Sequence, residues 1–523
     1  MHKGLFLICL TFFNVLFAQE IQWEKNIGGS KSEYLSDIIG TPDNGFLLAG
    51  SSYSGKSGTK AIGGQGDLDY FIWKINENGD VEWQNSFGGL GSDELIKINS
   101  TWEGGYILAG MSNSGNDGDK KSSNYGLNDF WIVKINPFGE EEWQLSIGGK
   151  GNDMMIDILE TYDRGFLIAG TSDSDSEIYS NNVLLNQIEE NKGNSDFWVI
   201  KISEKGAIEW QRTLGGKYVE ELKGVQLTKD QGYILSGNSN SPQSGDKISE
   251  NIGQEDFWIL KLNEAGEIEW EKSLGGEMSD NLTNIIPTND NGFIIGGTTQ
   301  QNKDQDINID WWIMKMDVKG DVEWEKTIDI GSRDVLVGIN KTKAGNYLLS
   351  GFNEVIGTTN QKDKQDGEDY IAIKIDETGK ELWRKKIGGK SSDRLNKTLV
   401  TRDGGYILAG TSDSKSNEDK KSENFGREDF WVVKLLDSES QLEKIEESIE
   451  VYPNPARDYV NILIHQPFKS ADLQIVDMAG AIVQENTIKQ KLTPINIMQL
   501  STGIYILKIK IIDQMYTKKV IKL

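Results

Sequence analysis

The chain has 523 residues, with 81 acidic against 55 basic side chains and a formal net charge of −26. A surface this acidic repels nucleic acid and anionic lipid, which argues against a function on either of them. The length exceeds one ordinary domain, so at least two are expected. After residue 18, no apolar run approaches the roughly 18 residues of a spanning helix, and no transmembrane segment is predicted in the mature chain.

The first 18 residues, MHKGLFLICLTFFNVLFA, combine a short basic start, a brief apolar run and a small residue at Ala18. This pattern is typical of a secretory signal peptide, so we expect export through the periplasm and a mature chain that begins near Gln19. Cys9, the only cysteine, lies inside this segment. The mature protein is therefore expected to fold without disulfides, by burial and strand pairing.

From about residue 19 to 436 the sequence repeats one unit. A tryptophan marks each copy at intervals of 54 to 67 residues: Trp23, Trp83, Trp143, Trp210, Trp270, Trp324 and Trp383. A fixed period of this length indicates a repeat architecture. Each copy contains four short runs of aromatic and β-branched residues, bounded by glycine and Asx turns, which predicts four strands.

Seven four-stranded units predict an all-β fold, a seven-bladed β-propeller at residues 19–436. Residues 21–29 read as a fourth strand with no first three before it, and the last copy stops after its third strand. We therefore expect the N-terminal strand to complete the last blade, which leaves no exposed sheet edge. A parallel solenoid is the alternative, although about 60 residues is long for one coil.

A tryptophan recurs in the third strand of most copies. It occupies Trp131, Trp198, Trp258, Trp312 and Trp431, with Phe71 and Ala372 assigned to the same place in the other two copies. Because aromatic side chains dominate core burial, we predict that this row packs between blades. Stacking on sugars is the alternative interpretation.

The repeats contain neither histidine nor cysteine, since His2 and His465 lie outside them. Zinc sites and nucleophiles activated by histidine draw on those side chains, so neither chemistry is expected there. Paired carboxylates and a metal held by oxygen ligands remain compatible with the sequence.

Seven acids enter the first strands of the units, and they are Glu33, Asp93, Asp153, Glu220, Asp280, Asp334 and Asp393. The first strand of a propeller blade lies nearest the axis, so these acids are predicted to surround the mouth of the central channel. Crowded like charges would raise their pKa values or attract a cation. The alternative is that each acid caps its own turn.

The loops between second and third strands are long and polar, for example at residues 112–129, 239–256 and 412–429. Closely spaced acids with amide and carbonyl oxygens suit calcium, and Asp117 with Asp119 is the candidate pair. No loop shows EF-hand spacing, and Asx and Ser turns explain the same residues without a ligand.

Two copies depart from the pattern. The third has a long loop, residues 172–195, which is expected to form a short helix or lid and which carries Glu177, Glu189 and Glu190. In the sixth, the residues Asp329 to Gly331 replace the usual glycine pair, and a less regular blade is expected there.

After an acidic linker at residues 437–448, the sequence changes character. Residues 449–523 hold nine basic and six acidic side chains and alternate apolar residues with turns. A small antiparallel β-sandwich is predicted for this tail.

The tail resembles the type A C-terminal sorting domain of the Bacteroidetes type IX (Por) secretion system. The resemblance rests on Tyr452, Pro453, Asn454, Pro455, Gly480, Gly503, Tyr505, Lys518 and Lys519. It implies recognition by the secretion machinery and release from, or attachment to, the outer surface. The repeats in turn resemble a unit found in uncharacterised exported proteins of these bacteria, which implies a propeller and no particular activity.

Together these features predict a secreted or surface-attached binding or adhesion module for a glycan or protein ligand. One alternative is a carbohydrate-active enzyme, because two carboxylates suffice for glycoside hydrolysis. The other is a structural component of the surface or matrix.

Overall fold

The fold was analysed in a computed structural model of the chain. It describes residues 19–175, 177–185, 189–300, 308–331, 333–354, 367–437, 448–512 and 514–523. The predicted signal peptide, residues 1–18, and linker residues 438–447 lie outside the described residues.

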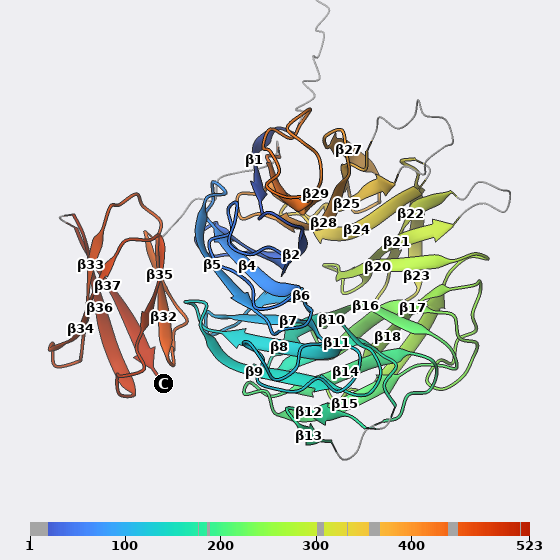
Figure 1. Cartoon of the computed structure of the whole chain (residues 1–523), viewed down its shortest axis with the longest axis horizontal. Helices are drawn as coiled ribbons and strands as arrows, with labels where there is room; N and C mark the ends of the chain where they lie inside the picture. The colour runs from blue at the N-terminus through green and yellow to red at the C-terminus, as the bar shows by residue number, and fades with distance from the viewer. Residues whose placement is uncertain are drawn as a thin grey trace, which may run out of the picture.

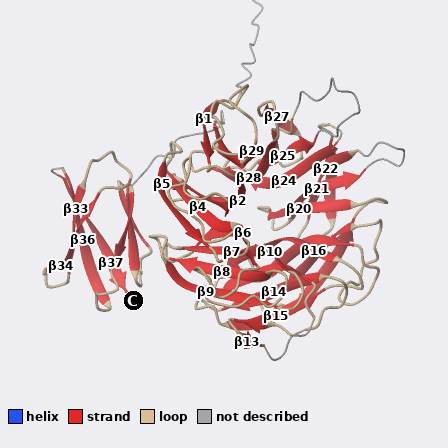
Figure 2. Cartoon of the chain, in the orientation of Figure 1, coloured by secondary structure: helices blue, strands red, loops and turns tan. Residues whose placement is uncertain are grey.

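The described chain is all-β, as predicted, and contains no helix (Figure 2). In most repeats the third strand is buried along its whole length, as in β8 (Asp129–Ile135), and the second strand along most of it. The first and fourth strands are partly exposed. This explains why the second and third strands read as continuous apolar runs such as YILAG and DFWIVKI, whereas the flanking strands mix polar and apolar residues.

The repeat region contains six sheets, four of which have four strands each. One has β2 (Glu33–Gly40), β3 (Phe46–Ser52), β4 (Asp69–Ile75) and β5 (Val81–Phe87). Another has β10 (Asp153–Glu160), β11 (Phe166–Ser172), β14 (Asp196–Ile202) and β15 (Ile208–Leu214). A third has β16 (Glu220–Leu227), β17 (Tyr233–Ser239), β18 (Asp256–Leu262) and β19 (Ile268–Leu274). The fourth has β28 (Asp393–Val400), β29 (Tyr406–Ser412), β30 (Asp429–Leu435) and β1 (Ile21–Ile27).

The two larger sheets are variations on the same antiparallel meander. A six-stranded sheet contains β6 (Asp93–Ser100), β7 (Tyr106–Ser112), β8 (Asp129–Ile135) and β9 (Glu141–Gly148), with the added hairpin β12 (Tyr179–Ser180) and β13 (Val183–Leu184). The eight-stranded sheet holds two meanders. They are β20 (Asp280–Pro287), β21 (Phe293–Gln300), β22 (Ile309–Met316) and β23 (Val322–Ile328), then β24 (Arg333–Lys341), β25 (Tyr347–Glu354), β26 (Tyr370–Ile375) and β27 (Glu381–Ile387). A single parallel pair, Ile309 with Arg333, joins them.

We number these meanders units 1 to 7 in the order of their first strands, β2, β6, β10, β16, β20, β24 and β28. Each first strand contacts the first strand of the next unit, and β28 contacts β2. Figure 1 shows the sheets grouped around a common centre. Two faces result: the loop face carries the loops between second and third strands and those between units, and the hairpin face carries the remaining turns.

The N-terminal strand completes unit 7. Strand β1 pairs antiparallel with β30, with Glu24 opposite Val433 and Ile27 opposite Phe430. This pairing was predicted from the complementary ends of the array, and it covers the edge that β30 would otherwise expose.

The third-strand tryptophans pack between neighbouring units, as predicted. The ring of Trp131 in unit 2 lies 4.7 Å from that of Tyr70 in unit 1, and Trp431 in unit 7 lies 4.9 Å from Tyr370 in unit 6. The assignment of Ala372 to this row was wrong. Ile371 stands opposite the second-strand glycine, as Trp131 does in unit 2, because the sixth copy is aligned one residue earlier.

The second-strand glycine of each unit is needed for this packing. A Cβ at Gly110 would lie 2.0 Å from the carbonyl oxygen of Glu94 and 2.6 Å from the hydroxyl of Tyr70 in the preceding unit. The backbone therefore makes room for an aromatic side chain of the neighbouring unit, which explains the final glycine of YILAG.

The tail forms two further sheets beside the repeats (Figure 1). One contains β31 (Ile449–Tyr452), β32 (Tyr459–Ile464) and β35 (Leu492–Asn496). The other contains β34 (Ile482–Ile488), β33 (Ala471–Val476), β36 (Gly503–Ile511) and β37 (Gln514–Lys522). Val460, Ile475 and Leu507 belong to one core that both sheets share.

Candidate functional site

The seven first-strand acids are buried, with exposed fractions of 0–1%. Each accepts a hydrogen bond from a backbone N–H four residues earlier, at 2.6–2.8 Å. In unit 2, Asp93 accepts from Gly89 N at 2.7 Å and from Ser114 Oγ at 2.8 Å. Their carboxylates therefore face the turns of their own units, the arrangement of the turn-capping interpretation.

A second set of buried acids was not predicted from the sequence. An aspartate lies at the start of the third strand, or one residue from it, in every unit: Asp69, Asp129, Asp196, Asp256, Asp310, Asp369 and Asp429. All seven are at most 5% exposed. Each lies near the first-strand acid of the next unit, as Asp129 lies near Asp153. Burial, together with the negative charge of Asp153, raises the pKa of Asp129 to about 7. The available indication was that an aspartate directly precedes an aromatic residue at the third strand of every copy.

Buried lysines lie among these acids in four units. Lys60, Lys120, Lys247 and Lys420 come from the loops between second and third strands and are at most 1% exposed. Lys120 Nζ donates to the Ser114 carbonyl at 2.7 Å and is attracted by Asp129 and Asp93. Burial lowers the pKa of Lys60 to about 8. In these four units the ammonium group of a buried lysine therefore offsets part of the negative charge of the buried acids.

Asp117 and Asp119, the calcium ligands suggested by the sequence, accept hydrogen bonds from the turn between units 1 and 2. Asp117 Oδ1 accepts from Leu90 N at 2.6 Å, and Asp119 Oδ2 accepts from Gly88 N at 3.3 Å. Burial raises the pKa of Asp119. Within the described part of the chain, this pair does not belong to any group of three or more metal-ligand side chains.

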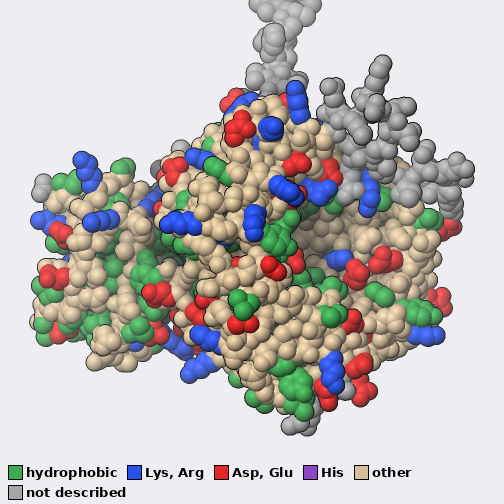
Figure 3. Space-filling model, viewed as in Figure 1, with side chains coloured by type: hydrophobic (Ala, Val, Ile, Leu, Met, Phe, Trp, Pro, Cys, Tyr) green, Lys and Arg blue, Asp and Glu red, His purple; other side chains and the backbone are tan. Residues whose placement is uncertain are grey.

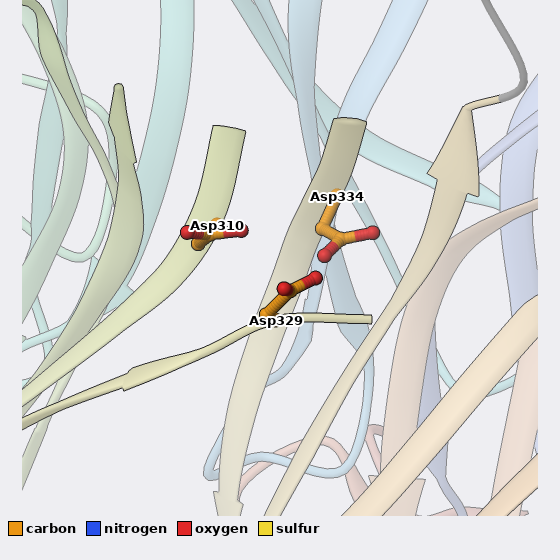
Figure 4. A group of neighbouring side chains, drawn as sticks. All are labelled: Asp310, Asp329 and Asp334. Atoms are coloured by element: carbon orange, nitrogen blue, oxygen red, sulfur yellow. The ribbon is translucent and has the colours of Figure 1, made fainter. Parts of the chain in front are cut away.

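The one such group among the described residues lies between units 5 and 6. One oxygen each of Asp310, Asp329 and Asp334 lies within 4.8 Å of the others (Figure 4). Asp334 is 0% exposed and Asp310 is 3% exposed, whereas Asp329 is open to solvent. Burial, with the charges of Asp329 and Asp334, raises the pKa of Asp310 to about 6. From the sequence, the replacement of the glycine pair by Asp329 to Gly331 predicted only a less regular blade.

The unit 3 loop contains a hairpin where a short helix or lid was expected. Tyr179 and Ser180 of β12 pair with Gly148 and Ile147 of β9, so the loop extends the unit 2 sheet. Pairing with β9 fixes residues 179–180 as strand, and pairing with β12 does the same for residues 183–184. Ser176 and residues 186–188 lie outside the described residues.

The acids of that loop form surface ion pairs. Glu177 pairs with Lys150, and Glu189 Oε1 lies 2.8 Å from Arg212 Nε. Glu190 lies next to Glu189 and is exposed. The three acids do not converge on a common group.

Exposed aromatic side chains gather on the loop face where units 7 and 1 meet. Tyr34, Tyr53 and Phe425 are 40%, 38% and 47% exposed. The rings of Tyr34 and Tyr53 meet edge to face at 6.2 Å, and Phe425 lies against Gly58 in the loop that follows Tyr53. Sequence reasoning missed this aromatic group because its members occupy three different parts of the repeat.

The tail contacts the hairpin face of the repeats. Arg457 Nη1 lies 2.5 Å from Glu204 Oε1 and 3.6 Å from Glu103 Oε1. The ring of Tyr459 lies 5.6 Å from that of Phe138, edge to face. Basic and aromatic side chains of the tail thus meet the turns of the hairpin face.

The structure brings the two ends of the sorting motif together. Asn454 Nδ2 donates to the Lys519 carbonyl at 2.7 Å and Asn454 Oδ1 accepts from Ile521 N at 3.0 Å. Tyr452, Asn454, Lys518 and Lys519 line one pocket.

The remaining motif residues shape the tail. The peptide bonds before Pro453 and Pro455 are cis. Gly480 takes a φ of 86° in the turn after β33, where its N–H donates to the Asp477 carbonyl at 3.0 Å. Gly503 begins β36, and the hydroxyl of Tyr505 donates to the Ser501 carbonyl at 2.8 Å.

Comparison with known proteins identifies the tail. Residues 450–523 match the family model of the secretion system C-terminal sorting domain, which confirms the type IX sorting domain inferred from the sequence. The tail therefore implies interaction with the secretion machinery and export to the cell surface or the extracellular space. No helix in the described part of the chain is long and apolar enough to cross a membrane.

No curated protein matches the chain. Similar solved structures include a subtype N10 neuraminidase-like protein of a little yellow-shouldered bat isolate, 9% identical, covering 65% of this chain and 93% of that one with a TM-score of 0.31. A luciferin-regenerating enzyme is 8% identical; the match covers 80% of this chain and 96% of the enzyme, with a TM-score of 0.33. A glucose dehydrogenase is 10% identical; the match covers 64% of this chain and 100% of the dehydrogenase, with a TM-score of 0.32. TM-scores this low assign no function to the chain.

Proposed function

We propose that residues 19–436 form a seven-bladed β-propeller that works outside the cell as a binding module, exported by a sorting domain at residues 449–523. The cyclic succession of first strands and the completion of unit 7 by β1 support the propeller. The sorting-domain match supports export. The ligand is an extracellular one, for which a glycan is the first candidate.

The observation that carries the proposal is the aromatic group of Tyr34, Tyr53 and Phe425 on the loop face. Exposed aromatic rings that also have polar neighbours are suited to stacking on sugar rings and to anchoring protein ligands. Glu428 lies beside Tyr34 and offers an acceptor for ligand hydroxyls. Figure 3 shows hydrophobic and acidic side chains beside a hollow in the middle of the repeats.

The contacts of the unusual acids favour binding over glycoside hydrolysis. Hydrolysis needs two carboxylates that face one substrate, about 5–10 Å apart. In unit 3, Glu177 and Glu189 are held by Lys150 and Arg212 instead. The acids that recur in every unit are buried and hydrogen-bonded to their own turns.

A glycan array probed with the chain from Gln19 onward tests the proposal. A double variant with Tyr53→Ser and Phe425→Ser is expected to lose at least tenfold in affinity for any glycan bound by the wild type. The matched control is Tyr162→Ser, which removes a side chain that is 61% exposed on the hairpin face and should bind as the wild type does. Absence of glycan binding, or equal binding by the double variant, would reject this site and favour a protein ligand or a structural role.

A further inference from the structure

The junction between units 5 and 6 lacks the glycine pair of the other six, because Asp329 and Ile330 replace it. At the other junctions, the position five residues before the first-strand acid is glycine: Gly28, Gly88, Gly148, Gly215, Gly275 and Gly388. A Cβ at any of them would lie only 1.6–2.2 Å from Oδ1 of the third-strand aspartate. Glycine therefore leaves room for that carboxylate. Between units 5 and 6, Asp329 occupies this position and adds a third acid beside Asp310 and Asp334.

The charge balance of this junction also differs. At each of the other six, a lysine lies near one of the paired acids: Lys60, Lys120, Lys192, Lys247, Lys386 or Lys420. Between units 5 and 6, a cation that acts on Asp334 is the guanidinium of Arg384. This guanidinium also pairs with Glu381, so its charge is shared with a further carboxylate.

An oxygen in this cluster is buried without a partner. Asp334 Oδ2 accepts from Ile330 N at 2.7 Å and Gly331 N at 3.1 Å, but Asp334 Oδ1 is buried and accepts no hydrogen bond. The carboxylates of Asp334 and Asp329 point toward each other (Figure 4). Asp93, Asp280 and Asp393 also bury an unpartnered Oδ1, but a lysine lies near each of those acid pairs. Here the buried oxygen lies among three carboxylates, an arrangement that a positive ligand would stabilise.

We propose that Asp310, Asp329 and Asp334 bind a calcium ion. Carboxylate oxygens are ligands for hard divalent cations. At Ca²⁺–O distances of about 2.3–2.6 Å, opposite oxygens are separated by about 4.6–5.2 Å. The ligand oxygens of the cluster lie within 4.8 Å of one another, so all three can reach one calcium ion without a change in the backbone. Mg²⁺, with bonds of about 2.0–2.1 Å, would hold opposite oxygens closer together.

The site is separate from the aromatic group in units 7 and 1, and it does not depend on the proposed ligand. It also differs from the pair Asp117 and Asp119, whose carboxylates are used by backbone N–H groups of the neighbouring turn. Asp329 is the replacement that adds a charge to this junction, so it is the residue to change.

Calorimetric titration of the chain from Gln19 onward with CaCl₂ or MgCl₂ provides the test. Terbium luminescence, excited through Trp311 and Trp312 next to Asp310, reports on the position of the ion. The wild type is expected to bind one Ca²⁺ more tightly than Mg²⁺. Asp329→Gly restores the residue of the other six junctions, so it should fold normally and bind Ca²⁺ at least tenfold more weakly.

Asp117→Asn is the matched control, because it removes an acid from the loop face at another junction and should leave Ca²⁺ binding unchanged. The proposal is overturned by a wild type that binds no Ca²⁺, by an Asp329→Gly variant that binds as well as the wild type, or by tighter binding of Mg²⁺. Loss of binding in Asp117→Asn with retention in Asp329→Gly would move the site to the unit 2 loop and overturn it as well.

Discussion

Trp431 offers a direct test of how the repeats are joined. Its side chain is 0% exposed, and its ring lies 4.9 Å from that of Tyr370 in unit 6. Its Nε1 donates to Glu24 Oε2 on β1 at 2.7 Å. One side chain therefore connects two units and the N-terminal strand.

Two substitutions separate its contributions. Trp431→Ala removes a fully buried aromatic side chain and is expected to lower the free energy of unfolding by about 3–5 kcal/mol. Trp431→Phe keeps most of the buried surface and loses the hydrogen bond to a charged carboxylate, which is expected to cost about 1.5–3 kcal/mol. The lower end is expected because the hydroxyl of Ser422 still donates to Glu24.

Urea unfolding of the chain from Gln19 onward, followed by circular dichroism, measures both effects. Trp102→Ala is the control, since Trp102 is 38% exposed on the hairpin face and packs under Arg164 at 3.6 Å. Loss of this cation–π contact should cost only about 0.5–1 kcal/mol. Equal destabilisation by Trp431→Ala and Trp102→Ala would refute the view that the units are held together by this row of side chains.

Two further predictions concern the junctions and the strands. The pKa of Asp129 is raised to about 7 from 3.8, so its junction is most stable when protonated, and stability is lost as the pH rises from about 4 through 7. Asp129→Asn should flatten the fall in unfolding free energy between pH 4 and 8 by up to about 4 kcal/mol, and an unchanged pH profile would contradict this assignment. Gly110→Ala should cost about 1–3 kcal/mol, because its Cβ would meet the Glu94 carbonyl at 2.0 Å. Gly55→Ala, where a Cβ would meet nothing within 4 Å, should change stability by less than about 0.5 kcal/mol in the same urea unfolding measurement.

The strands of the repeats could be predicted from the sequence because the same pattern of residues occurs in each unit. Four apolar runs separated by glycine turns recur in every copy, and they became four antiparallel strands. The pairing of β1 with β30 was predictable for a different reason: the fragments at residues 21–29 and after Lys434 were complementary. The tryptophan row was also predictable, because a large apolar side chain repeated at one strand position has to be buried.

The polar interior was not predictable in the same way. Asp129 and Asp153 are 24 residues apart and belong to different units, so their proximity depends on how the units pack. Lys120 reads as a loop charge, and only the fold shows that its ammonium group is buried between carboxylates. The acids Asp117 and Asp119 suggested calcium because the sequence does not show which backbone N–H groups they would meet.

The aromatic group and the acid cluster lie on one face and make separable predictions. Asp329 follows the fourth strand of unit 5, and Phe425 lies in the loop before the third strand of unit 7, so both belong to the loop face. If each site works alone, Asp329→Gly abolishes calcium binding and leaves glycan binding intact, whereas the Tyr53 and Phe425 double variant does the reverse. Loss of glycan binding in Asp329→Gly would instead indicate that the ion orders the whole face, because the two sites share no residue through which a local change could act.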